Sequence, residues 1–140
     1  MQFLQWLTRL LRRGSPQRTA EATSQPIPQV TADDVERVVC RDFTPDEYTT
    51  VTMILNEYGT EKWHREPTRV RLATLKVASG SVQKLRALID SAKQDYRDAL
   101  AAAEFPAYFK IGVRVRELPE KERRRIIDDD WLQYEEWLRR

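Results

Sequence analysis

Few side chains in this 140-residue chain could do chemistry, because it holds one histidine and one cysteine. Glu61 and His64 have the Glu-x-x-His spacing that forms half of a carboxylate-bridged di-iron motif in helical bundles. The complete site needs two such motifs, and one subunit with a single histidine cannot supply them. The alternative is a histidine at a helix end, with Trp63 beside it packed on the core.

A nucleophile and a base are the next possibility. His64 could act as the base, because an imidazole changes charge near neutral pH, and Cys40 could act as the nucleophile. Cys40 follows two valines of an apolar stripe, so we expect it to be a small buried residue. Three successive acids, at 128–130, would point about 100° apart on a helix and could not converge on one cation, so we expect them to be solvated. We therefore predict no catalytic, cofactor-binding or metal-binding residue, and a non-enzymatic protein.

Composition sets the outer limits. The chain has 24 basic and 22 acidic residues, with 33% charged and 41% hydrophobic residues, which is too apolar for a wholly disordered chain. A chain of this length is typical of one domain with a real core. One cysteine excludes an intramolecular disulfide framework, and no apolar run approaches the roughly 18 residues of a membrane-spanning helix.

The first 13 residues have the periodicity of a short, basic, amphipathic helix. At 100° per residue their large apolar side chains share one face, which is formed by Phe3, Leu4, Trp6, Leu7, Leu10 and Leu11. The rest of the surface carries Arg9, Arg12 and Arg13. Such a helix could lie on an anionic membrane, fill a hydrophobic groove on a partner, or fold back onto its own body.

Residues 14–31 are rich in Pro, Ser, Thr and Gln, which predicts a flexible linker that tethers the first helix to a helical domain at 32–140. Within that domain, start and stop signals predict helices at about 32–41, from Thr44-Pro45 to Gly59, at 67–79, at 81–104, and from Pro119 onward. The fold class is all-α, a bundle of four to five helices. The 67–79 helix is apolar on several sides and should be central.

Residues 110–116 alternate between apolar and other side chains, which predicts one short extended segment with Ile111, Val113 and Val115 on one side. We expect it to pack on the helices, and pairing with another chain is the alternative. Residues 110–125 carry a net charge of +4, and the best candidates for nucleic-acid contact are Arg114, Arg116, Arg123, Arg124 and Arg125.

Part of the chain also resembles a group of small helical bacterial proteins that carry no functional name. The resemblance covers roughly residues 45–108 and rests on Glu57 to Glu61, Trp63 to Glu66, Arg69 to Ala73, Leu75-Lys76, Asp95 to Asp98, Leu100-Ala101 and Ala103 to Pro106. It implies a helical core and a bacterial, intracellular origin. It implies no activity, ligand or cofactor.

These patterns together predict a small cytoplasmic protein-interaction module that docks an unidentified protein partner. Its first helix would recruit it to a partner groove or, peripherally, to the inner face of the membrane. A nucleic-acid accessory protein that uses the 110–125 cluster is the alternative, and an enzyme of unrecognised type is the third possibility. Trp131 and Trp137 on the last helix are possible interface residues, or else members of the core.

Overall fold

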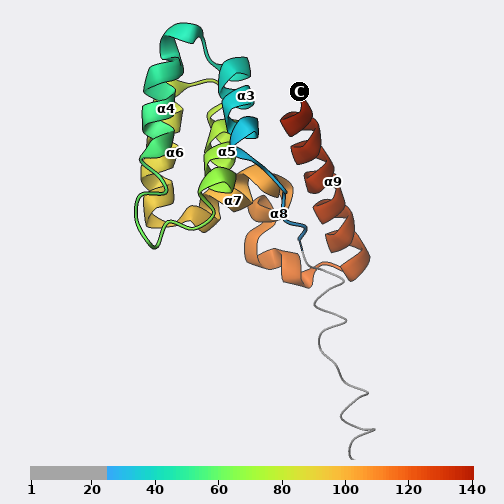
Figure 1. Cartoon of the computed structure of the whole chain (residues 1–140). Helices are drawn as coiled ribbons and strands as arrows, with labels where there is room; N and C mark the ends of the chain where they lie inside the picture. Colours follow the sequence, from blue (N-terminus) through green and yellow to red (C-terminus); the bar gives the residue numbers. More distant parts are fainter. Residues whose placement is uncertain (1–24) are drawn as a thin grey trace, which may run out of the picture.

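The computed structural model describes residues 25–140. This part of the chain is all-helical, which confirms the predicted all-α class, and it holds no strand. In chain order its elements are α3 (Ala32–Asp42), the 3-10 helix η1 (Pro45–Glu47), α4 (Tyr48–Asn56), α5 (Pro67–Ala78), α6 (Val82–Gln94), α7 (Tyr96–Glu104), α8 (Pro106–Ile111), the 3-10 helix η2 (Gly112–Glu117) and α9 (Glu120–Arg139). Figure 1 shows α5 inside the bundle and α9 standing along one side.

The helix starts follow from local chemistry. Thr31 caps α3, because its hydroxyl accepts the N–H of Asp34 while the Asp34 carboxylate accepts the N–H of Thr31 at 2.9 Å. Pro67 occupies the first turn of α5, where a missing N–H costs nothing. The predicted central position of this helix is confirmed: its buried residues are Val70, Leu72, Ala73, Thr74, Leu75 and Ala78.

The predicted single helix over 81–104 is wrong, because the chain breaks at Asp95. This residue is extended, with φ −147° and ψ 100°, and its carboxylate accepts the N–H of Arg97 at 3.0 Å. Asp95 therefore caps a new helix, α7. With this break and the separate α8, residues 25–140 hold seven α-helices, more than the four or five that were predicted.

The predicted extended segment at 110–116 is also wrong: these residues complete α8 and form η2. Their alternation does not mark one buried face, because Val115 is buried while Val113 is 83% exposed. Two N–H groups at the start of α8 are fixed from α9, since the Asp130 carboxylate accepts those of Ala107 at 3.2 Å and Tyr108 at 2.9 Å. This capping favours a helix over an extended arm.

A buried ion pair joins the two helices that share the largest contact. The Arg69 guanidinium on α5 donates to both carboxylate oxygens of Glu104 on α7, with N–O distances of 2.6 to 2.9 Å. Glu104 is 1% exposed. Burial raises the pKa of Glu104, and its contact with Arg69 opposes that rise.

Candidate interface at the basal end

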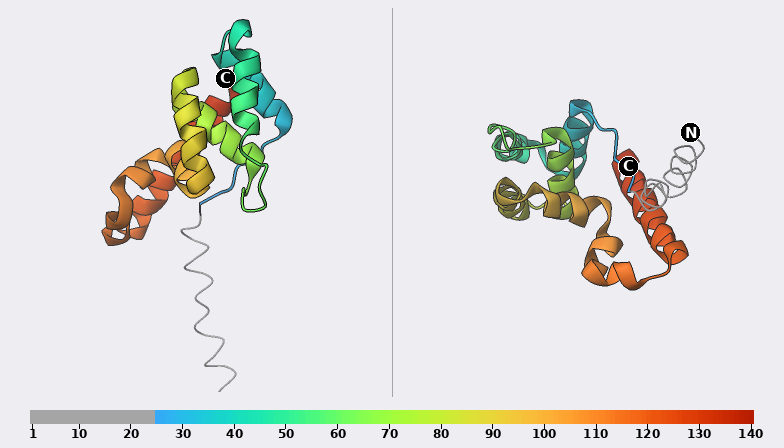
Figure 2. Two further views of the ribbon diagram at one scale, coloured as in Figure 1. Left: turned by 90° about the vertical axis from the view of Figure 1, so that its left-hand side faces the viewer. Right: turned by 90° about the horizontal axis from the view of Figure 1, so that it is seen from below.

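The basic residues of 110–125 gather at one end of the molecule. In Figures 1 and 2 the α8–η2 segment and the start of α9 lie at the same end as residue 25, where residues 1–24 join the described chain. We call this end the basal end and residues 110–125 the basal segment. Arg114 and Arg116 lie on η2 and the other three predicted arginines on the first turns of α9.

Four of the five arginines of the predicted nucleic-acid cluster are exposed, namely Arg114, Arg116, Arg124 and Arg125. Arg123 is half-buried, and its guanidinium lies 3.5 Å from the Arg116 carbonyl oxygen, which it donates to. The corner between η2 and α9 therefore holds one arginine inward and presents four to solvent. This arrangement can bind an extended anionic surface, whose phosphates need charge rather than a shaped pocket.

One apolar side chain of this segment is almost fully exposed: Val113, between Lys110 and Arg114 in the chain, is 83% exposed. Phe109 is 45% exposed, but it lines a groove with residues of α5, α6 and α7. The alternation of 110–116 places Val113 on the packed side of an extended segment, so the sequence does not predict its exposure. Gly112 is the residue in the sequence that could have indicated a turn here, since it has a positive φ of 66° where the chain passes from α8 to η2.

Charge is strongly segregated along the chain. The basal segment has seven basic and three acidic residues, for a net charge of +4, and residues 1–24 have a net charge of +3. The whole chain has +2, which leaves −5 for the remaining 100 residues. An anionic surface would therefore attract the basal end and repel the rest of the body, which gives the molecule a preferred orientation.

A broad cleft within residues 25–140 has a structural explanation for its cations. A cleft of about 1250 Å³ is lined by the C-terminal ends of α3, α5 and α9. Arg41, Lys76 and Arg139 lie in the last turns of these three helices. The lining also holds a fourth cation, Arg140, and two acids, Asp42 and Glu136. Two carboxylates and three helix ends of roughly −0.5 charge each oppose the four cations, so the cleft is close to neutral. Burial also lowers the pKa of Lys76. We therefore do not place the candidate site here.

The two tryptophans of α9 have different surroundings. Trp137 is 7% exposed and belongs to the core cluster, with the Arg41 guanidinium 5.2 Å from its ring centroid. Trp137 is therefore a member of the core and not an exposed interface residue. Trp131 is half-buried.

The other chemistry candidates have ordinary roles in the described part of the chain. Cys40 is exposed, so the prediction that it is buried is wrong. Asp130 is buried against α8, so the prediction that 128–130 are all solvated fails at this residue, whereas Asp128 and Asp129 are exposed. The Nδ1 atom of His64 accepts the N–H of Gly59 at 3.0 Å. Within residues 25–140, no group of three or more potential metal ligands lies together.

The amphipathic helix predicted at the start of the chain lies outside the described residues. Its predicted contact residues are Phe3, Leu4, Trp6, Leu7, Leu10, Leu11, Arg9, Arg12 and Arg13. Among the described helices, none is long and apolar enough to cross a membrane. No family model, curated protein or solved structure matches the chain. The resemblance to bacterial helical proteins stays a prediction.

Proposed function

We propose that the protein is a small, non-enzymatic interaction module that attaches peripherally to an anionic membrane surface through its basal end and residues 1–13. The observation that carries the proposal is the segregation of charge, with +7 in residues 1–24 and the basal segment and −5 elsewhere. The anionic inner leaflet of a bacterial membrane is a surface of the required sign. Attached in this way, the body would present its acidic remainder to a protein partner.

Exposed apolar side chains favour a membrane over nucleic acid as the anionic partner. Val113 lies between Lys110 and Arg114 in the chain, and a bilayer interface offers its exposed side chain an apolar environment that a phosphate backbone does not. The apolar face predicted for residues 1–13 fits the same partner. A helix of 13 residues gives modest affinity by itself, so a second basic element in the body is needed for stable attachment.

Vesicle flotation of the full chain tests the proposal. We expect binding to vesicles of equal phosphatidylglycerol and phosphatidylcholine, and none to pure phosphatidylcholine. Replacement of three basal arginines by glutamine (Arg114, Arg116 and Arg125) should cost about 3 kcal/mol, at about 1 kcal/mol per charge near the surface. That cost is roughly a 100-fold loss of affinity at low salt.

The matched control removes three exposed cations from the start of α6 and the end of α9, at the opposite end of the molecule: Lys84, Arg139 and Arg140, each replaced by glutamine. The control should leave binding nearly unchanged, because these residues would face away from the surface. An equal loss in both triple variants would contradict an oriented attachment. The nucleic-acid alternative would prevail if the protein shifted a 30-base-pair DNA duplex, lost that shift in the basal variant, and failed to float with anionic vesicles.

A further inference from the structure

A stack of three aromatic rings leads from the core to solvent in the loop between α4 and α5. Tyr58 is fully buried, and the His64 ring lies over it with the ring centroids 4.6 Å apart and the planes 14° apart. The Trp63 ring meets His64 edge-on, at 5.8 Å and 79°. Trp63 itself is 65% exposed, so the expectation that it packs on the core is wrong. A large apolar side chain is thus held against a fixed support while most of its surface remains in water.

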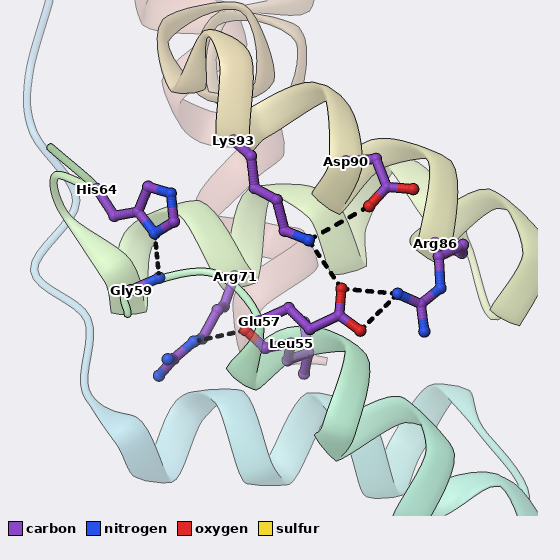
Figure 3. A network of polar contacts seen from close by, with 8 residues as sticks. All are labelled: Leu55, Glu57, Gly59, His64, Arg71, Arg86, Asp90 and Lys93. Atoms are coloured by element: carbon purple, nitrogen blue, oxygen red, sulfur yellow. Dashed lines mark hydrogen bonds and ion pairs between the residues drawn. The ribbon is translucent and has the colours of Figure 1, made fainter. Parts of the chain in front are cut away.

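Hydrogen bonds hold this loop in one shape. His64 Nδ1 accepts the N–H groups of Gly59 and Glu61, at 3.0 and 3.3 Å. The Tyr58 hydroxyl donates to the Arg65 carbonyl at 2.8 Å, and the Arg71 guanidinium donates to the carbonyls of Leu55 and Tyr58. Figure 3 shows His64 at Gly59 and Arg71 at Leu55. Since the loop is ordered beforehand, little conformational entropy is lost when Trp63 binds something.

A second set of contacts anchors the start of the loop. The Glu57 carboxylate accepts from Arg86 at 2.6 Å and from Lys93 at 2.9 Å, and both partners lie on α6 (Figure 3). These hydrogen bonds, that of Arg86 first, lower the pKa of Glu57. The chain that leaves α4 is therefore tied to α6 before it turns towards Trp63, and the loop keeps a fixed position relative to the bundle.

The loop lies at the basal end. Figure 1 and the left view of Figure 2 place the α4–α5 loop at the same end as α8, η2 and residue 25, and the view from below spreads these segments around that end. We propose that Trp63 is a further membrane anchor of the body, whose ring enters the interfacial layer of an anionic bilayer when the basal end lies on it. This inference rests on the proposed function. Tryptophan is enriched at that layer, because its ring is apolar and its N–H still finds a polar partner.

A flat, fluid surface explains the placement better than a pocket on a protein. Trp63 and Val113 are single exposed apolar tips on separate segments of one end, and each has basic neighbours, Lys62 with Arg65 in one case and Lys110 with Arg114 in the other. Residues 59–66 have no net charge, so the loop adds apolar contact while the basal segment supplies the attraction. Two separate apolar side chains and a basic segment can all contact lipid headgroups without a surface of complementary shape.

The test compares Trp63→Ala and Trp63→Phe with Leu132→Ala in the full chain. Leu132 is an exposed apolar residue of α9 and serves as the matched control. The probe is vesicles of equal phosphatidylglycerol and phosphatidylcholine, and the readout is the partition coefficient from co-sedimentation. We expect Trp63→Ala to lower the partition coefficient roughly tenfold. This is the effect of losing the transfer of about 55 Å² of apolar surface from water into the bilayer. Trp63→Phe should lose less and Leu132→Ala almost nothing.

Brominated phosphatidylcholine in the same vesicles gives a second readout. It should quench the tryptophan fluorescence of the wild-type chain more than that of the Trp63→Phe variant. Equal partitioning and equal quenching in the wild type and both Trp63 variants would overturn the anchor and leave the proposed function intact. A wild-type chain that does not bind anionic vesicles would overturn both. Unchanged circular dichroism and melting temperature in the variants would assign any loss of binding to the side chain.

Discussion

Removal of the Glu104 carboxylate should destabilise the bundle more than removal of any exposed charge. The Glu104→Ala change leaves the Arg69 guanidinium, whose side chain is 16% exposed, without the acid that accepts its three hydrogen bonds. Breaking a buried ion pair from one side costs about 3 to 5 kcal/mol in free energy of unfolding, because an uncompensated charge stays buried. That cost is a large part of the roughly 5 to 15 kcal/mol that stabilises a typical domain.

The cost converts into a melting temperature. At about 2.1 cal/mol/K per residue, the described 116 residues have an unfolding entropy of about 0.24 kcal/mol/K. The melting temperature of Glu104→Ala should therefore fall by about 12 to 20 °C. Differential scanning calorimetry at pH 7 measures this directly, and chemical denaturation gives the free energy independently.

A double variant separates the lost pair from the lost packing. Arg69→Met combined with Glu104→Leu removes both charges and keeps the volume, so its stability should return to within about 2 kcal/mol of wild type. If the melting temperature of the single variant fell by less than about 4 °C, the reasoning would be refuted. So would a double variant as unstable as Glu104→Ala, because the unpaired charge would then not be the cause.

Three further predictions concern local structure. Gly80→Ala should cost about 2 kcal/mol or more, measured by urea unfolding, because φ is +80° and the new Cβ would lie 2.8 Å from the Asp42 carbonyl oxygen; an unchanged midpoint would contradict the close approach of α3 and α5. The hydrogen bond from the Thr31 N–H lowers the pKa of Asp34 below 3.8, so this carboxylate stabilises the fold above that pH and the stability is lost as pH falls through the lowered pKa. Asp34→Asn should therefore lose less stability than wild type between pH 5 and pH 2, and equal losses would exclude the cap as the source. His64→Ala should speed hydrogen exchange at the amide of Gly59, while amides inside α5 keep their rates; NMR exchange measures both, and an unaltered Gly59 rate would contradict the bond to Nδ1.

The helix boundaries that the sequence predicts well are those set by local chemistry. Thr31 and Pro67 act within one turn of themselves, and α3 and α5 begin where these residues predict. The all-α class and the central place of α5 follow from apolar patterning, which reflects burial in any fold. The start of α9 after Pro119 is of the same kind.

The errors arise where a pattern has two physical causes. The apolar stripe of 81–104 continues on both sides of Asp95, so periodicity alone predicts one helix. In the structure Asp95 caps a second helix, α7. The alternation at 110–116 is typical of a strand, yet the capping from Asp130 comes from another helix and leaves no local mark in the sequence. The first error is therefore local, since Asp95 caps α7 through the N–H of Arg97, and only in the second does a tertiary contact override local preference.

The candidate site was predictable in its charges and not in its shape. The five arginines of the basal segment stand out in the sequence, but the position of the α4–α5 loop at the same end depends on the packing of α4 against α6. His64 drew attention as a titratable residue, whereas its role is to support Trp63 and receive two main-chain N–H groups. The Arg69–Glu104 pair joins residues 35 apart that share no recognisable spacing.

The contact between α3 and α9 has a consequence for the order of folding. Arg37 and Arg41 on α3 donate to the carbonyls of Leu138 and Trp137, at 2.6 and 2.7 Å, across 101 and 96 residues. α3 is the first of the described helices to be synthesised and α9 is the last. The α4–α7 core can form while translation continues, but these two arginines have no carbonyl partners until α9 has left the ribosome. Closure of this long loop should be a late event in folding, and a nascent chain stalled before residue 130 would expose the core surface that Tyr134 and Trp137 cover.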